Sequence, residues 1–94
     1  MKMEVLRFTA SWCQPCKALA KQLDELGLAG SVTAVDIDEQ PELAQKYGVR
    51  GVPTLVAVDN GKEVKRMVGI KAKDILIDWF PKIADNENII KSSN

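Results

Sequence analysis

Two cysteines are the residues of this chain best suited to chemistry. Cys13 and Cys16 are the only cysteines among its 94 residues, and histidine is absent. The two intervening residues let the second thiol approach the first and close a small disulfide ring. Without histidine, neither a Ser-His-Asp nor a Cys-His catalytic arrangement can form, nor can a zinc site that includes histidine. The spacing therefore indicates thiol–disulfide chemistry or half of a metal site.

The metal interpretation needs ligands from elsewhere. A closed zinc site takes about four nitrogen or sulfur ligands, whereas one chain supplies two thiols. A dimer or nearby carboxylates would have to complete such a site. The flanking Trp12 and Pro15 fit the redox interpretation better, so we favour redox chemistry and expect no metal.

The elements around the cysteines place them at the start of a helix. Residues 4–9 are rich in strand-favouring types, and residues 13–26 have apolar side chains at helical spacing. Pro15 is tolerated in a first helical turn, and Gly27 is a plausible helix end. The apolar residues of this helix are Ala18, Leu19, Leu23 and Leu26.

This position favours a nucleophilic role for the first cysteine. The N-terminus of a helix carries partial positive charge, which stabilises a sulfur there as the thiolate. We expect Cys13 to be that thiolate and Cys16 to be the resolving partner. Lys17 is expected to be a solvated first-turn residue that lies close enough to help attract thiolates.

The remaining pattern predicts a mixed four-stranded sheet with helices on both faces, in the order βαβ-α-ββα. The first two strands, separated by one helix, should pair in parallel with a right-handed crossover. Asn60-Gly61 is typical of a tight hairpin turn between the last two strands. Further strands are expected at residues 32–37, 54–58 and 63–68, and further helices at 42–47 and 72–80.

The C-terminal part is expected to complete the domain and then become a tail. The helix at 72–80 should bury Ile75, Leu76, Trp79 and Phe80, and Pro81 should kink or end it. We predict a domain at residues 1–84 and a polar tail at 85–94 with one apolar pair.

Composition restricts the classes of partner. Thirteen basic and thirteen acidic residues give zero net charge, which offers no general field for nucleic acid or an anionic membrane. Apolar runs fall far short of the roughly 20 residues that cross a bilayer. The N-terminal residues lack the features of a secretory signal. We expect a single cytoplasmic domain that acts as a monomer, without nucleic-acid or membrane partners.

The segment Trp12-Cys13-Gln14-Pro15-Cys16-Lys17 resembles the W-C-G-P-C-K signature of thioredoxins, with Gln14 in place of glycine. Residues 47–55 resemble the family's stretch around its cis-proline, and Gly69, eight residues after Gly61, matches the hairpin that follows. The resemblance covers about residues 4–83. It implies a minimal thioredoxin fold that lacks the usual N-terminal strand and helix.

The resemblance also implies residue roles. Cys13 would attack a substrate disulfide, and Cys16 would release the mixed disulfide as the Cys13–Cys16 disulfide forms. Pro53 would be cis and opposite the cysteines. A substrate groove would be formed by Val52, Pro53, Thr54, Gly69 and Ile70. No bound cofactor is implied; a flavoenzyme resembling thioredoxin reductase would supply electrons for the reduction of protein disulfides.

Besides Gln14, three further positions depart from the family pattern. A buried Asp that accepts a proton from the resolving thiol falls at Arg7, and its Lys partner falls at Ala34. A tryptophan two residues after that Asp falls at Thr9. The residues leave open whether Arg7 faces the cysteines and favours the thiolate, pairs with Asp36, or extends to solvent.

Two other functions remain as alternatives. A glutaredoxin-like enzyme that depends on glutathione would share the chemistry, but such proteins typically have T-V-P and a paired glycine, whereas Gly51 precedes Val52-Pro53 here and Gly69 stands alone. An accessory binding subunit of a larger complex would use the fold without the cysteines. The neutral charge and the lack of an insertion offer no support for it.

Overall fold

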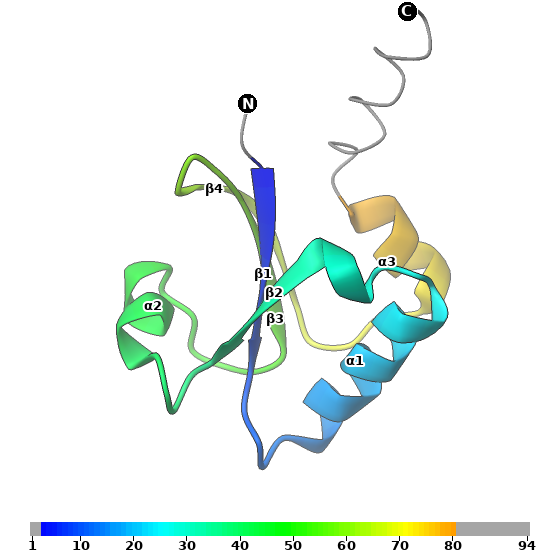
Figure 1. Ribbon diagram of the computed structural model, residues 1–94, viewed down its shortest axis with the longest axis horizontal. Coiled ribbons are helices and arrows are strands. Elements are labelled where there is room, and N and C mark those ends of the chain that lie inside the picture. Colours follow the sequence, from blue (N-terminus) through cyan, green and yellow to red (C-terminus); the bar gives the residue numbers. More distant parts are fainter. Residues whose placement is uncertain (1–2, 81–94) are drawn as a thin grey trace, which may run out of the picture.

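The computed structural model describes residues 3–80. Its elements follow the predicted order, with one additional 3₁₀ turn, η1, after the first helix (Figure 1). The strands are β1 (Met3–Thr9), β2 (Val32–Asp36), β3 (Thr54–Asp59) and β4 (Lys62–Val68), and the helices are α1 (Gln14–Glu25), η1 (Ala29–Ser31), α2 (Pro41–Lys46) and α3 (Lys73–Trp79).

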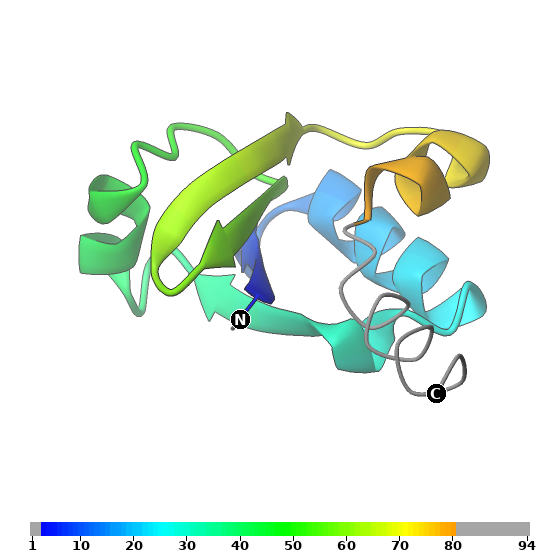
Figure 2. The same cartoon turned by 90° about the horizontal axis from the view of Figure 1, so that it is seen from above.

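The four strands form one mixed sheet in the order β2-β1-β3-β4. β1 pairs in parallel with β2 and antiparallel with β3, and β4 pairs antiparallel with β3. Figures 1 and 2 show α1 and α3 on one side of this sheet and α2 on the other. The predicted fold class is therefore confirmed, and α1 begins just beyond the carboxyl end of β1.

Each face of the sheet has its own apolar cluster. Alternating side chains of a strand point to opposite faces, so Val5 joins the α1 side, whereas Leu6 and Phe8 join the α2 side. The α1 cluster consists of Val5, Leu19, Leu23, Leu55, Ala57, Met67, Leu76 and Phe80, and the α2 cluster of Leu6, Phe8, Val35, Ala44, Val56 and Val58.

The predicted burial of Ile75 is wrong, and Ala18, one of the apolar residues of the first helix, is also exposed. Ile75 is 52% exposed although its neighbour Leu76 is fully buried. Successive side chains of a helix are turned by about 100°, and this short helix buries Leu76 and Phe80, four residues apart, with Trp79 packed beside them. Ala18 of α1 is exposed for the same reason, because Leu19 and Leu23 form the inward stripe.

The remaining differences are small or fall outside the described residues. Helix and strand ends differ from the predicted ones by one residue, and the 3₁₀ turn after α1 was not predicted. No helix within residues 3–80 has the length and apolar character needed to span a membrane. The predicted effect of Pro81, the domain end at 84 and the tail at 85–94 lie beyond those residues.

Candidate functional site

Cys13 and Cys16 form a disulfide at the N-terminus of α1, with their Cα atoms 5.2 Å apart. Cys13 is the N-cap of the helix. Its Sγ atom accepts a hydrogen bond from the backbone N–H of Cys16 at 3.1 Å. A sulfur thus occupies the position where a helix offers unpaired N–H groups and partial positive charge, which lowers the energy of a thiolate at that atom.

The backbone around the disulfide fixes the start of the helix. The N–H of Cys13 donates to the carbonyl oxygen of Ala10 at 3.2 Å, which turns the chain out of β1 and into α1. Pro15 occupies the first turn, where its missing N–H has no intrahelical partner to lose. Gln14, Pro15 and Lys17 are all exposed, in contrast to the two buried sulfur residues.

A second segment, the loop between α2 and β3, also approaches the disulfide. We call residues 48–53 the groove loop; it connects α2 to β3. The peptide bond between Val52 and Pro53 is cis, as the resemblance implies. Val52 packs against a small cluster formed by Ala10, Cys13 and Cys16. Val52 thus brings this loop against the cysteines, and the position of Pro53 opposite them stays a prediction.

The loop after β4 lies next to the groove loop. The N–H of Gly69 donates to the carbonyl oxygen of Pro53 at 2.9 Å. Gly69 has φ of +84°, a conformation that favours glycine, so the chain can leave β4 at this point without strain. Ile70 follows it and is exposed, whereas Thr54 is buried at the start of β3.

Trp12 stands exposed beside the disulfide and is held by a residue that the sequence did not indicate. Its indole Nε1–H donates to Asp38 Oδ2 at 2.9 Å, although 64% of Trp12 is accessible to solvent. Asp36 orders the turn that carries Asp38, because its Oδ1 accepts from the N–H groups of Asp38 and Glu39 at 2.8 and 3.3 Å. The alternation of apolar and acidic residues at 35–38 gave no hint of this contact.

The geometry of the site agrees with three comparisons with known proteins. The family model described as Thioredoxin matches residues 1–82. A thioredoxin of Chlamydia trachomatis is 42% identical over 81 residues, which cover 83% of this chain and 79% of that protein. A thioredoxin of Chlamydia caviae is 45% identical over 76 residues, 78% of this chain and 74% of that protein.

This chain belongs to the thioredoxin family. A solved structure, the thioredoxin of Fasciola hepatica, matches it with a TM-score of 0.69 and 35% identity, over 82% of this chain and 76% of that one. As a thioredoxin with its redox-active Cys13–Cys16 pair, the protein is a protein-disulfide oxidoreductase.

Arg7 occupies the face of the sheet that α1 covers. It alternates with Val5 along β1 and lies opposite Leu55 of the α1 cluster in the strand register. It is half-buried, and burial lowers its pKa from the ordinary value. Whether its charge acts on the cysteines stays a prediction. This position distinguishes the chain from the thioredoxin pattern described above.

The suggested ion pair between Arg7 and Asp36 does not form. Within residues 3–80 the ion pairs are Glu63–Arg66 and Glu25–Lys73, and the Oδ1 atom of Asp36 is engaged by the turn that follows it. The strand register explains why the pair is absent, because Arg7 lies beside Ala34, whereas Asp36 lies beside Thr9 at the strand end. Asp36 therefore supports the loop under Trp12 instead of balancing the arginine.

The described part of the chain contains no cluster of three or more His, Cys, Asp or Glu residues that could hold a metal ion. Thioredoxins carry no cofactor, and the dithiol itself undergoes the redox change.

Proposed function

We propose that this thioredoxin reduces protein disulfides with Cys13 as the attacking thiolate and Cys16 as the resolving thiol. One observation carries the assignment: Cys13 Sγ is the N-cap acceptor of α1 and takes the N–H of Cys16 at 3.1 Å. Such hydrogen bonds and the helix dipole favour the charged form of that sulfur. Both cysteines are buried in the disulfide form, at 4% exposed for Cys13 and 1% for Cys16, so the N-cap contact and not accessibility separates their roles.

The reductive step transfers two electrons from the dithiol to the substrate disulfide, and the donor described below restores the dithiol. The Cys13 thiolate attacks one sulfur of the substrate disulfide; the substrate S–S bond breaks, a mixed disulfide forms, and one substrate thiolate leaves. The Cys16 thiolate then attacks Cys13 Sγ, breaks the mixed disulfide and releases the second substrate thiolate. The substrate is reduced, and the Cys13–Cys16 disulfide is the oxidised product.

We propose that the surface beside the disulfide binds an extended peptide segment of the substrate. In our proposal the backbone of Val52 pairs with the substrate chain, and Pro53, Thr54, Gly69 and Ile70 border it. The exposed Trp12 supplies an apolar contact on the side of the substrate chain opposite these residues. Backbone pairing of this kind is tolerant of side-chain sequence, which suits a protein that reduces many disulfides.

The reduced dithiol must be regenerated by an electron donor. We propose a flavoenzyme that resembles thioredoxin reductase as the donor and the cytoplasm as the compartment. A reducing compartment keeps thiols free, which a protein-disulfide reductase requires. A direct test is to mix the oxidised protein with such an enzyme and a reduced nicotinamide cofactor. Reduction of the Cys13–Cys16 disulfide should then appear as a decrease of the nicotinamide absorbance.

Single cysteine variants test the assignment of roles. Cys16→Ser should attack a protein disulfide and remain as a stable mixed disulfide, because no resolving thiol is left. Cys13→Ser should neither reduce nor trap the substrate. Mass spectrometry of non-reduced adducts distinguishes the two. Trapping by Cys13→Ser in place of Cys16→Ser would reverse the assignment.

A further inference from the structure

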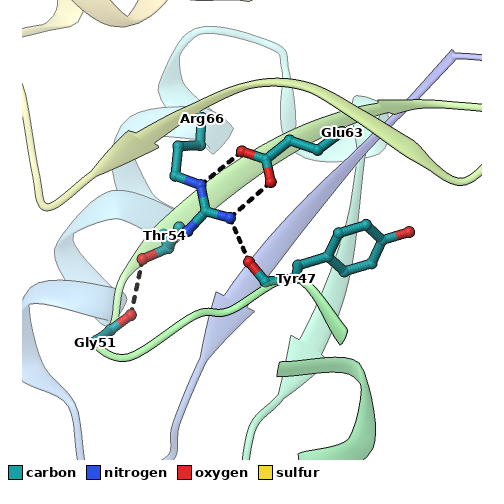
Figure 3. A network of polar contacts seen from close by, with 5 residues as sticks. All are labelled: Tyr47, Gly51, Thr54, Glu63 and Arg66. Carbon is teal, nitrogen blue, oxygen red and sulfur yellow. Dashed lines mark hydrogen bonds and ion pairs between the residues drawn. The ribbon is translucent and has the colours of Figure 1, made fainter. Parts of the chain in front are cut away.

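The start of the groove loop is fastened to β4 by an arginine outside the disulfide site. Arg66 lies opposite Val56 in the strand register, and so on the α2 side of the sheet. Its Nε and Nη2 atoms donate to the two carboxylate oxygens of Glu63 at 2.6 and 2.7 Å. Nη2 also donates to the main-chain carbonyl oxygen of Tyr47 (Figure 3). One planar guanidinium thus holds a carboxylate and a carbonyl together.

The carbonyl that Arg66 holds belongs to the C-cap of α2. Tyr47 is that C-cap, and the groove loop begins at the next residue. Carbonyl oxygens at the end of a helix lack intrahelical donors and carry partial negative charge, so a cation there is favourable. The Tyr47 hydroxyl adds a second tether, because it donates to the carbonyl oxygen of Gly61 in the hairpin turn at 2.9 Å.

The far end of the groove loop is fastened to the same strand region. Thr54 Oγ1 donates to the carbonyl oxygen of Gly51 at 2.8 Å, within the bend that Figure 3 shows. The carbonyl oxygen of Pro53 accepts from Gly69, which follows β4. Arg66 precedes Gly69 by three residues, and β4 ends between them at Val68. The loop is therefore tied to β4 and its extension at both ends, in addition to the partly buried packing of Val49 and Val52.

We infer that Arg66 is a positioning residue for substrate binding, which acts through Tyr47 to hold the groove loop at its distance from the disulfide. The inference rests on the function proposed above. Arg66 contacts Glu63 and Tyr47 and neither sulfur. Its loss should therefore impair the binding of a peptide that pairs with the loop, while the sulfur chemistry is unchanged.

Two substrates separate binding from chemistry. Insulin presents its disulfides within a polypeptide and needs the groove, whereas 5,5′-dithiobis(2-nitrobenzoate) is a small disulfide that needs only an accessible thiolate. For Arg66→Met we expect KM for insulin to rise about fivefold, a ratio equivalent to about 1 kcal/mol, the size of one lost hydrogen bond. The kcat for insulin and the second-order rate constant with the small disulfide should stay within about twofold.

Lys73→Met is the matched control. It also removes the cation of an ion pair, the one with Glu25 at 2.7 Å, but that pair joins α3 to α1 and not to the groove loop. We expect a wild-type KM for this variant. Arg66→Lys keeps the charge but cannot span Glu63 with two N–H groups and still reach Tyr47, so its KM should rise less than that of Arg66→Met.

The outcomes decide between positioning and general structural loss. A selective rise in KM for insulin in both Arg66 variants supports the inference. An unchanged KM, an equal loss with both substrates, or an equal rise in Lys73→Met overturns it. If Arg66→Met does not fold, as judged by circular dichroism, a wild-type KM in Arg66→Lys still overturns it. A wild-type protein that reacts with the small disulfide but not with insulin would instead contradict the proposed function.

Discussion

The two sides of the disulfide site are held in place by different forces. On the α1 side, Leu19 and Leu23 are 1% exposed each and pack into the larger apolar cluster of the sheet. On the other side, the groove loop packs only partly buried apolar side chains, and hydrogen bonds from Arg66, Tyr47 and Thr54 hold it. Apolar burial contributes more free energy than exposed polar contacts do, whereas polar contacts are more directional. Stability should therefore depend on the first side and substrate geometry on the second.

The largest effect is expected from the apolar side. Leu76→Ala should lower the free energy of unfolding by about 2 to 5 kcal/mol, because Leu76 is fully buried and its loss leaves a cavity. Ile75→Ala is the matched control on the same helix, and it should cost less than about 1 kcal/mol because Ile75 is 52% exposed. Urea unfolding measures both. Equal losses would contradict the observed burial of α3.

A smaller effect is expected at the start of the groove loop. Gly48 has φ of +62°, and a Cβ atom there would meet no atom within 4 Å, so the cost of Gly48→Ala is conformational. We expect a loss of about 1 to 2 kcal/mol. Gly51→Ala, which also has open space but no positive φ, should change stability by less than about 0.5 kcal/mol. Similar losses in the two variants would show that φ is not the cause.

Tyr47→Phe should have a smaller effect still. It removes the hydroxyl donor to Gly61 but keeps the ring, which packs edge-to-face on Phe8 with centroids 6.3 Å apart. An exposed hydrogen bond contributes about 0.5 to 1 kcal/mol. Thermal unfolding measures the loss. A value as large as that of Leu76→Ala would remove the contrast between the two sides.

The smallest effect is a dependence on pH from the Glu63–Arg66 pair. The Arg66 guanidinium holds the pKa of Glu63 below its ordinary value. Stability from this shift is present above the ordinary glutamate pKa and is lost as pH falls through the lowered one. Solvent screens the pair, so the loss should be small. Melting temperatures of the wild type and Glu63→Gln should converge as the pH falls below about 4; a constant difference would exclude the pair as the cause.

The sequence predicted those parts of the molecule that depend on local pattern. Apolar spacing located every strand and α-helix, and the helix start at Cys13 followed from Pro15 and the C-x-x-C motif. The cis peptide before Pro53 followed only from the resemblance, since few X–Pro bonds are cis. These features are determined by neighbours in the chain or by a shared motif.

The missed features depend on contacts between distant parts of the chain. Trp12 and Asp38 are 26 residues apart, and Arg66 and Tyr47 are 19 apart. Each contact requires a strand register and a side-chain direction that no local pattern encodes. The alternative in which Arg7 pairs with Asp36 is not found, because Asp36 lies beside Thr9 and its Oδ1 atom is engaged by the turn that follows it.

Strand β3, one of the two inner strands of the sheet, sets how slowly one end of the groove loop can open. Its residues Thr54 to Val58 are all buried, and it has a hydrogen-bonded neighbour on each side. Amides of such a strand exchange with solvent only when most of the domain unfolds, whereas loop amides exchange by local opening. Because Pro53 immediately precedes this strand, one end of the groove loop is attached to the element expected to open most slowly. Hydrogen exchange should therefore show protection that rises steeply from Gly51 to Leu55.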